Sequence, residues 1–131
     1  MNEKLIWIAD DDPIFKLIFN MTIIKAKDNL KIEEFKNGRL VCQSFRDAVE
    51  NRENMPYCLF MDLNMPEMNG WECLDEIRDL YDTAKVPMPK IFVISSSINK
   101  DDEKKIAHYP FTAGYLRKPI SVAKFKEILG G

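Results

Sequence analysis

The chain has 131 residues, of which 46% are hydrophobic and 31% charged, and its formal net charge is −2. These values are typical of one globular domain, and the nearly balanced charge gives no general attraction to nucleic acid or to an anionic membrane. No apolar run approaches the ~20 residues needed to cross a bilayer, and the first residues lead directly into a predicted strand rather than into a secretory signal. We therefore expect a cytoplasmic protein that binds neither membrane nor nucleic acid directly.

Three cysteines, Cys42, Cys58 and Cys73, are spread along the chain, and none belongs to a C-x-x-C pair. Their number is odd, and two of them lie in segments predicted as core. We interpret them as reduced, buried thiols rather than as a metal or redox site.

The first predicted elements are a strand over residues 4–9 and the helix that follows it. Asp12-Pro13 marks the helix start, because Asp is a favoured N-cap and proline is tolerated at the first helical position. Apolar residues with wide helical coverage continue this helix to about Ala26. A weaker strand is predicted over residues 30–36, at an edge of the sheet. The turn signal Asn37-Gly38 then precedes a second amphipathic helix.

The central strand is predicted over residues 57–62, and Gly70 opens a helix with one apolar stripe. A breaker-rich loop over residues 86–89 precedes a fourth strand over residues 90–95. Each of these two strands is almost wholly apolar, as expected for strands buried on both faces of a sheet.

The charged stretch over residues 99–108 is predicted as a poorly buried helix, with Ile98 and Ile106 as its main anchors. A fifth strand over residues 112–117 and a last helix capped by Ser121 complete the chain. Residues 99–108 are therefore expected to move at low cost.

Strand and helix alternate five times without an internal repeat or a linker. This pattern predicts an α/β fold: a five-stranded parallel sheet with helices on both faces, forming one domain over residues 1–131. Crossover handedness favours the strand order 2-1-3-4-5, which is the flavodoxin-like order. The first and third strands then lie side by side, and the acids at their carboxyl ends become neighbours.

Polar side chains occur at the carboxyl ends of four of the five strands. They are Asp10, Asp11 and Asp12 after the first strand, Asp62 on the third, Ser95 on the fourth and Lys118 after the fifth. Open α/β sheets bind ligands at this rim. Crowded carboxylates repel one another, and Mg²⁺ is a hard cation that would compensate them. We predict a metal site of Asp10, Asp11, Asp62 and a backbone carbonyl after Leu63. The alternative is a solvated turn with Asp12 as N-cap.

A carboxylate such as Asp62 can act as a nucleophile toward phosphorus. The oxygens of a transferring phosphoryl group must be neutralised, and the rim offers a cation, the Ser95 hydroxyl and the Lys118 ammonium for this purpose. Taken singly, Ser95 is an ordinary hydroxyl at a strand end and Lys118 an ordinary surface cation. Together with the acids they predict phosphoryl chemistry.

Four segments resemble the response-regulator receiver domain of two-component signalling. They are Ile8-Ala9-Asp10-Asp11-Asp12-Pro13, Met61-Asp62-Leu63-Asn64-Met65-Pro66-Glu67-Met68-Asn69-Gly70, Val93-Ile94-Ser95-Ser96 and Tyr115-Leu116-Arg117-Lys118-Pro119. The resemblance covers essentially the whole chain, and the D-x-N-M-P-x-M-N-G run is its most specific part.

This resemblance implies that Asp62 is the phosphoacceptor. It implies that Asp11 ligates Mg²⁺ (or Mn²⁺) directly, that Asp10 does so mostly through water, and that Asn64 offers its backbone carbonyl. The chain would then be no enzyme in the ordinary sense, but a switch that catalyses only its own phosphorylation and dephosphorylation.

The resemblance also assigns a role to each of four residues near the later strand ends. Ser95 is the switch hydroxyl, Tyr115 the switch aromatic and Lys118 the characteristic lysine, while Pro119 follows a cis peptide bond. Because His108 is the only histidine and is expected to be exposed, the phosphoryl group would come from a histidine kinase, a histidine phosphotransfer protein or a small phosphodonor.

The downstream target is expected on the face formed by residues 99–108, the fifth strand and the last helix. Tyr109, Phe111 and Ile120 are candidates for its apolar contacts; alternatively, Tyr109 and Phe111 fill the core. The sequence fits a stand-alone receiver, although excision from a longer protein stays open.

The best alternative function is a haloacid-dehalogenase-like, Mg²⁺-dependent phosphatase, in which Asp10 would be the nucleophile. It needs D-x-D-x-T/V after the first strand, and Asp10-Asp11-Asp12-Pro13-Ile14 lacks the final residue type. A flavodoxin-like cofactor binder is disfavoured because three acids after the first strand would repel a phosphate group.

Overall fold

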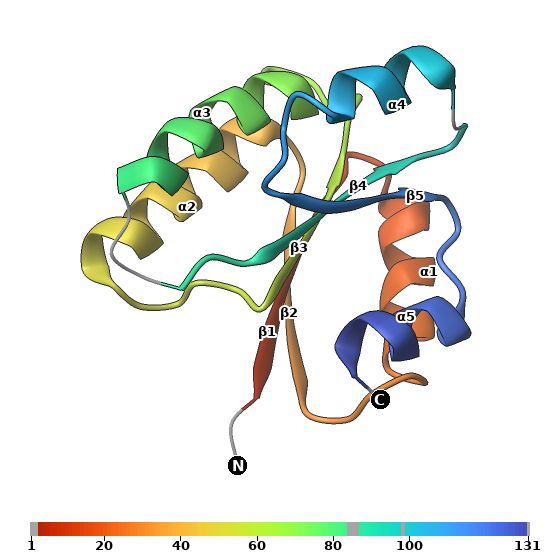
Figure 1. Ribbon diagram of the computed structural model, residues 1–131. Coiled ribbons are helices and arrows are strands. Elements are labelled where there is room, and N and C mark those ends of the chain that lie inside the picture. Colours follow the sequence, from red (N-terminus) through yellow and green to blue (C-terminus); the bar gives the residue numbers. More distant parts are fainter. Residues whose placement is uncertain (1–2, 84–86, 98, 131) are drawn as a thin grey trace.

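The computed structural model describes residues 3–83, 87–97 and 99–130 (Figure 1). Its strands are β1 (Lys4–Ala9), β2 (Leu30–Phe35), β3 (Cys58–Asp62), β4 (Lys90–Ser95) and β5 (Thr112–Arg117). Its helices are α1 (Pro13–Ile23), α2 (Gly38–Asn51), α3 (Gly70–Thr83), α4 (Lys100–Ile106) and α5 (Val122–Leu129). Ile98, an expected anchor of α4, and the start of the predicted 86–89 loop lie outside the described residues.

The five strands form one parallel sheet in the order β2-β1-β3-β4-β5, which confirms the predicted fold class and strand order. The weak strand β2 lies at an edge, as predicted. In the β1–β3 pair, Ala9 is the partner of Met61, so the next residues, Asp10 and Asp62, come level at the carboxyl end of the sheet. The register therefore places both acids at one rim.

Helices cover both faces of the sheet, with α2 and α3 on one face and α1 and α5 on the other (Figure 1). Alternation along β1 shows this division: Trp7 packs with the α2–α3 cluster, while Ile6 and Ile8 pack with the α1–α5 cluster. Side chains of successive strand residues point to opposite faces, so each face receives its own core.

Side-chain caps define most of the helix starts. The Asp12 carboxylate accepts a hydrogen bond from the backbone N–H of Ile14 at 2.9 Å, which confirms its predicted N-cap role. Asn99 caps α4 in the same way and lies outside it, so α4 is shorter than the predicted 99–108 segment. Within the described residues, no helix is long and apolar enough to cross a membrane.

Candidate functional site at the carboxyl end of the sheet

Asp10, Asp11 and Asp62 converge at the carboxyl ends of β1 and β3. Each offers one carboxylate oxygen, and these oxygens all lie within 4.8 Å of one another. Asp10 and Asp62 are buried, whereas Asp11 is exposed. Three carboxylate oxygens this close together fit a hard divalent cation, which prefers oxygen ligands and compensates their mutual repulsion.

Lys118 reaches into this group of acids from the loop after β5. Its Nζ lies 2.5 Å from Asp10 Oδ2 and 3.4 Å from Asp62 Oδ2, and it sits 4.4 Å from the centre of the Phe15 ring. The bond between Lys118 and Pro119 is cis, as predicted. The backbone N–H of Lys118 also donates to the carbonyl of Ser95 at 2.8 Å, which fixes this loop against the end of β4.

Burial and charge set the pKa values of this site. Burial alone would lower the pKa of Lys118, but Asp10 and Asp62 outweigh it and raise that pKa, so the ammonium stays charged. Burial and the neighbouring Asp10 charge raise the pKa of Asp62, although Lys118 and the backbone N–H of Asn64 oppose the shift. Ionisation of Asp62 is therefore less favourable here than in water, and added positive charge would favour it.

The predicted switch residues, Ser95 and Tyr115, both contact the turn after β4. Ser95 Oγ donates to the carbonyl oxygen of Ser97 at 2.8 Å and accepts from the Ser97 backbone N–H at 3.3 Å. The Tyr115 hydroxyl lies 3.2 Å from the same carbonyl oxygen and 3.3 Å from Asp102 Oδ2. The contact between Tyr115 and this turn was not predicted from the sequence, because it joins β5 to a turn and a helix earlier in the chain.

The loop from β3 to α3 is packed closely against Asp62. The Gly70 backbone N–H donates to the Leu63 carbonyl at 2.9 Å, and a Cβ on Gly70 would lie 2.6 Å from the Asp62 carbonyl oxygen. Asn69 and Glu72 exchange hydrogen bonds between side chain and backbone at 2.9 and 3.0 Å, a capping arrangement that starts α3. This cap was not predicted from the sequence, although Asn followed three residues later by Glu is its signal. The proposed role of the Asn64 carbonyl stays a prediction.

The residues expected to form an apolar output surface are packed inward. Tyr109 and Ile120 are only 5% and 6% exposed, and the Tyr109 hydroxyl donates to Asp75 on α3 at 2.8 Å. Phe111 is half-buried and stacks on Tyr81 with ring centres 5.0 Å apart. The expectation that these residues supply docking contacts is therefore wrong for Tyr109 and Ile120, and core packing explains them.

Exposed apolar side chains gather instead on α1 and the residue that caps it. They are Ile14, Leu17, Ile18, Met21 and Ile24, each 45–68% exposed. The sequence showed wide apolar coverage of this helix, but periodicity alone did not separate the face toward α5 from the face toward solvent. By contrast, α4 has no buried residue within its described length, which confirms that this helix is poorly anchored, and His108 is exposed as expected.

Comparison with known proteins decides the family. The model of the response regulator receiver domain matches residues 6–130. The chain belongs to this family. Receiver domains are signalling switches of two-component systems. The haloacid-dehalogenase-like alternative finds no support in these comparisons.

Sequence relatives of this receiver domain include regulators from several bacteria. CheV1, a chemotaxis protein of Helicobacter pylori, is 25% identical over 129 residues, covering 97% of this chain and 39% of CheV1. The nitrate/nitrite response regulator NarL of Escherichia coli K12 is 29% identical over 116 residues, covering 88% of this chain and 48% of NarL. DivK of Brucella ovis, a polar-differentiation response regulator, is 31% identical over 78 residues, or 60% of each chain. The chain thus spans less than two thirds of the length of these relatives.

Solved structures with the same fold are also response regulators. A two-component response regulator from Cytophaga hutchinsonii superposes with a TM-score of 0.80 at 19% identity, covering 99% of this chain and 96% of the other. The Mn²⁺-bound form of response regulator Rcp1 gives a TM-score of 0.67 at 25% identity, covering 97% and 90%. At these identities the likeness supports the fold, while the roles of individual residues rest on the geometry above.

Proposed function

We propose that this receiver domain accepts a phosphoryl group on Asp62 from the phosphohistidine of a histidine kinase or a histidine phosphotransfer protein, in the cytoplasm. The observation that carries this proposal is the position of Lys118. Its ammonium lies within ion-pair distance of both Asp10 and Asp62, while Asp11 completes a group of three acids. These distances support a common site for the proposed acceptor carboxylate, the ammonium group and the proposed metal ligands.

Asp10, Asp11 and Asp62 would hold Mg²⁺ or Mn²⁺, with the backbone carbonyl of Asn64 as a further proposed ligand. The chemistry that a bound cation supplies is neutralisation of charge on the acids and on the phosphoryl oxygens. Support comes from the three carboxylate oxygens within 4.8 Å of one another and from the raised pKa of Asp62, which added positive charge would lower. The Mn²⁺-bound structure of the relative Rcp1 is consistent with this assignment.

In the transfer step, a carboxylate oxygen of Asp62 attacks the phosphorus, and the bond between phosphorus and the donor's histidine nitrogen breaks. Lys118 pairs with one phosphoryl oxygen, which it reaches from its present place 3.4 Å from Asp62. Ser95 leaves the Ser97 carbonyl to donate its hydrogen bond to another oxygen. Tyr115 holds the same turn, so its contacts with Ser97 and Asp102 change when Ser95 moves.

Labelling with acetyl phosphate and Mg²⁺ tests this proposal. The wild-type chain gains one phosphoryl group, and the Asp62→Asn variant gains none. Asp11→Asn removes one acid of the group and should slow labelling by about tenfold or more, because it weakens the proposed metal site. Asp12→Asn is the matched control, because Asn is also a good N-cap and Asp12 lies outside the three-acid group. Labelling that persists in Asp62→Asn would overturn the proposal and point to Asp10 as nucleophile.

The exposed face of α1 is the proposed docking surface for the phosphodonor protein. α1 begins directly after the acidic residues, and Phe15 in its first turn contacts Lys118, so a protein that presents a phosphohistidine to Asp62 meets this helix. Its apolar stripe fits the apolar face of a helical partner. The downstream target remains assigned to the face of α4, β5 and α5, whose weakly anchored α4 is able to move.

A charge introduced on the exposed face of α1 separates docking of the phosphodonor protein from phosphoryl transfer to Asp62. With a histidine kinase selected because it phosphorylates the wild-type chain, Leu17→Glu should slow transfer while leaving labelling by acetyl phosphate unchanged. Leu40→Glu on α2 is the matched control, because Leu40 is an exposed leucine away from α1, and it should leave both reactions unchanged. Equal loss of kinase transfer in both variants would contradict the assignment of α1.

A further inference from the structure

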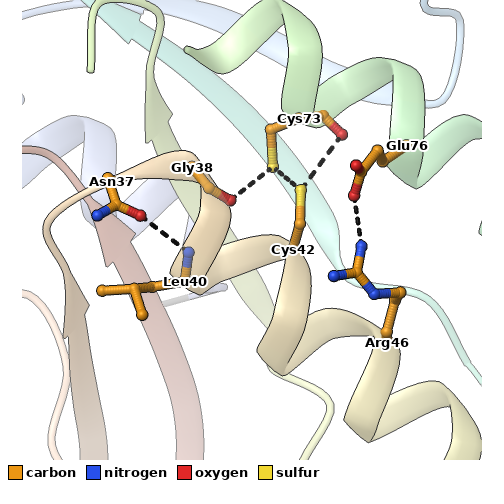
Figure 2. A network of polar contacts seen from close by, with 7 residues as sticks. All are labelled: Asn37, Gly38, Leu40, Cys42, Arg46, Cys73 and Glu76. Atoms are coloured by element: carbon orange, nitrogen blue, oxygen red, sulfur yellow. Dashed lines mark hydrogen bonds and ion pairs between the residues drawn. The ribbon is translucent and has the colours of Figure 1, made fainter. Parts of the chain in front are cut away.

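Two cysteines from neighbouring helices meet inside the α2–α3 face of the molecule. The Sγ atoms of Cys42 on α2 and Cys73 on α3 lie 2.6 Å apart, and both residues are buried, at 1% and 0% exposure. Figure 2 shows the two side chains pointing toward each other across the line of contact between the helices. A disulfide bond measures about 2.05 Å, so the two sulfur atoms are already close to bonding distance.

Polar contacts on both sides of the pair keep the two helices aligned. The Cys73 thiol lies 3.7 Å from the Gly38 carbonyl in the first turn of α2, and the Cys42 thiol lies 3.8 Å from the carbonyl of Cys73 itself. About one turn further along both helices, Arg46 and Glu76 form an ion pair at 2.5 Å (Figure 2). These contacts hold the two helices in the register that brings the sulfur atoms together.

We propose that Cys42 and Cys73 form an oxidisable pair, which a peroxide converts into an intramolecular disulfide linking α2 to α3. One thiol, as its thiolate, attacks a peroxide oxygen; the O–O bond breaks, giving a sulfenic acid and, with the thiol's proton, one product water in the case of hydrogen peroxide. The second sulfur then attacks the sulfenic sulfur, the S–O bond breaks, and the leaving hydroxide takes the second thiol's proton as another water. The two thiols supply the two electrons that reduce the peroxide.

The surroundings of the cysteine pair favour an intramolecular disulfide over a mixed disulfide with another thiol. The contact with Cys42 and burial both raise the pKa of the Cys73 thiol, so little thiolate forms and the reaction is slow. Burial excludes bulky thiols such as glutathione from the pair. Since each cysteine has the other as its nearest sulfur, a sulfenic acid formed on either one has the other thiol as its reaction partner.

Cys58 is an internal control. It is fully buried on β3, but its side chain packs on the opposite face of the sheet, in the α1–α5 cluster. Burial raises the pKa of its thiol to about 12. The sheet therefore lies between Cys58 and the pair, and Cys58 should remain a free thiol after oxidation.

Treatment of the purified chain with hydrogen peroxide tests the inference. The wild type contains three cysteines, and the number of thiols that titrate in denaturant should fall from three to one. A proteolytic map should show a linked pair of peptides containing Cys42 and Cys73, with the loss of two hydrogen atoms. A reducing agent should restore all three thiols. The oxidised protein should unfold at a higher urea concentration, because the bond closes a long loop in the unfolded chain.

Variants distinguish this pair from general oxidation. Cys58→Ser should fall from two titratable thiols to none, whereas Cys42→Ser and Cys73→Ser should each keep both of theirs. Because the map of the wild type does not depend on whether a variant folds, it is decisive. Three remaining thiols, a link through Cys58, or sulfinic acid on Cys42 or Cys73 without a link would each overturn the inference. The disulfide is independent of phosphorylation, so its failure leaves the proposed function intact.

Discussion

Helices α3 and α4 each follow a strand that carries a residue of the site, yet they are held to the fold very differently. α3 follows Asp62 and buries Gly70, Cys73, Leu74 and Ile77 against the sheet and α2. α4 follows Ser95 and has no buried residue within its described length. The turn before α4 is held by the hydroxyl groups of Ser95 and Tyr115, which both contact the Ser97 carbonyl.

This difference indicates how a small charge change could be converted into movement. The side with the proposed acceptor is well packed, so we expect Asp62 and its neighbouring acids to keep their geometry. The Ser95 side has few apolar contacts to break, and segments of this kind have low local stability. A phosphoryl group on Asp62 is therefore expected to rearrange α4 and to leave α3 in place.

The largest effect on stability is expected from replacing one isoleucine by alanine on each helix. Ile77 on α3 is fully buried, and Ile77→Ala should lower the free energy of unfolding by about 3–4 kcal/mol, because it leaves a cavity. Ile106 on α4 is only partly buried, and Ile106→Ala should cost about 1 kcal/mol. Urea unfolding measures both values. Equal losses of unfolding free energy in the two variants would show that α3 and α4 are anchored equally well.

A smaller effect is expected from adding a methyl group beside the acceptor. A Cβ on Gly70 meets backbone atoms of Asp62 and Leu63 at 2.6 and 2.8 Å, so Gly70→Ala should destabilise the chain by about 2 kcal/mol and slow phosphorylation. Gly114→Ala on β5 is the control, since its new Cβ would lie 3.4 Å from the Phe92 ring, in ordinary contact. Urea unfolding of the two variants, with acetyl phosphate labelling, checks this. If Gly70→Ala were as stable as Gly114→Ala, the acceptor side would not be rigid.

Removing the charge of Asp62 should stabilise the fold in the absence of metal. Because burial and Asp10 raise the folded pKa of Asp62, the stability that this group provides is fully present below its ordinary pKa of 3.8 and is lost as pH rises through the raised value. At pH 7 with a chelator, Asp62→Asn should therefore unfold at a higher urea concentration than the wild type. The difference in urea midpoint between Asp62→Asn and the wild type should disappear at acid pH.

Magnesium provides the control for that experiment. Binding to the folded state alone stabilises it, so Mg²⁺ should raise the urea midpoint of the wild type more than that of Asp62→Asn. A wild type that is the more stable of the two in chelator would contradict the assigned sign of the pKa shift.

The smallest effect is expected from Tyr115→Phe. The substitution removes the hydroxyl contacts to Ser97 and Asp102 and should cost about 0.5–1 kcal/mol, as for a single hydrogen bond at a partly exposed site. Amide exchange of Ser97 and α4 should become faster, while that of α3 is unchanged. Unchanged exchange at Ser97 would show that Tyr115 does not hold this turn.

The sequence predicted the sheet and the position of the rim because both follow from short-range patterns. Apolar runs located the strands, the alternation with helices gave their order, and Asp12-Pro13 gave a helix start. The meeting of Asp10 with Asp62 then followed from the register of adjacent parallel strands.

Contacts between side chains of different helices were not predictable in the same way. Cys42 and Cys73 are 31 positions apart, and their spacing contains no signal that α2 and α3 place them face to face. Tyr109 could either fill the core or face a partner, and its exposure of only 5% decides for the core. Packing of this kind depends on helix rotation and on the angle between helices, which periodicity does not determine.

Amide hydrogen exchange of the chain with and without a phosphoryl group on Asp62 would show which helix responds to phosphorylation. We expect protection to change at Ser96, Ser97 and α4, together with Tyr115 on β5, and to stay the same in α3. The Asp62→Asn variant given the same phosphodonor should show no change. A uniform change over both helices, or a change confined to α3, would contradict the claim that phosphorylation acts through the weakly anchored side of the site.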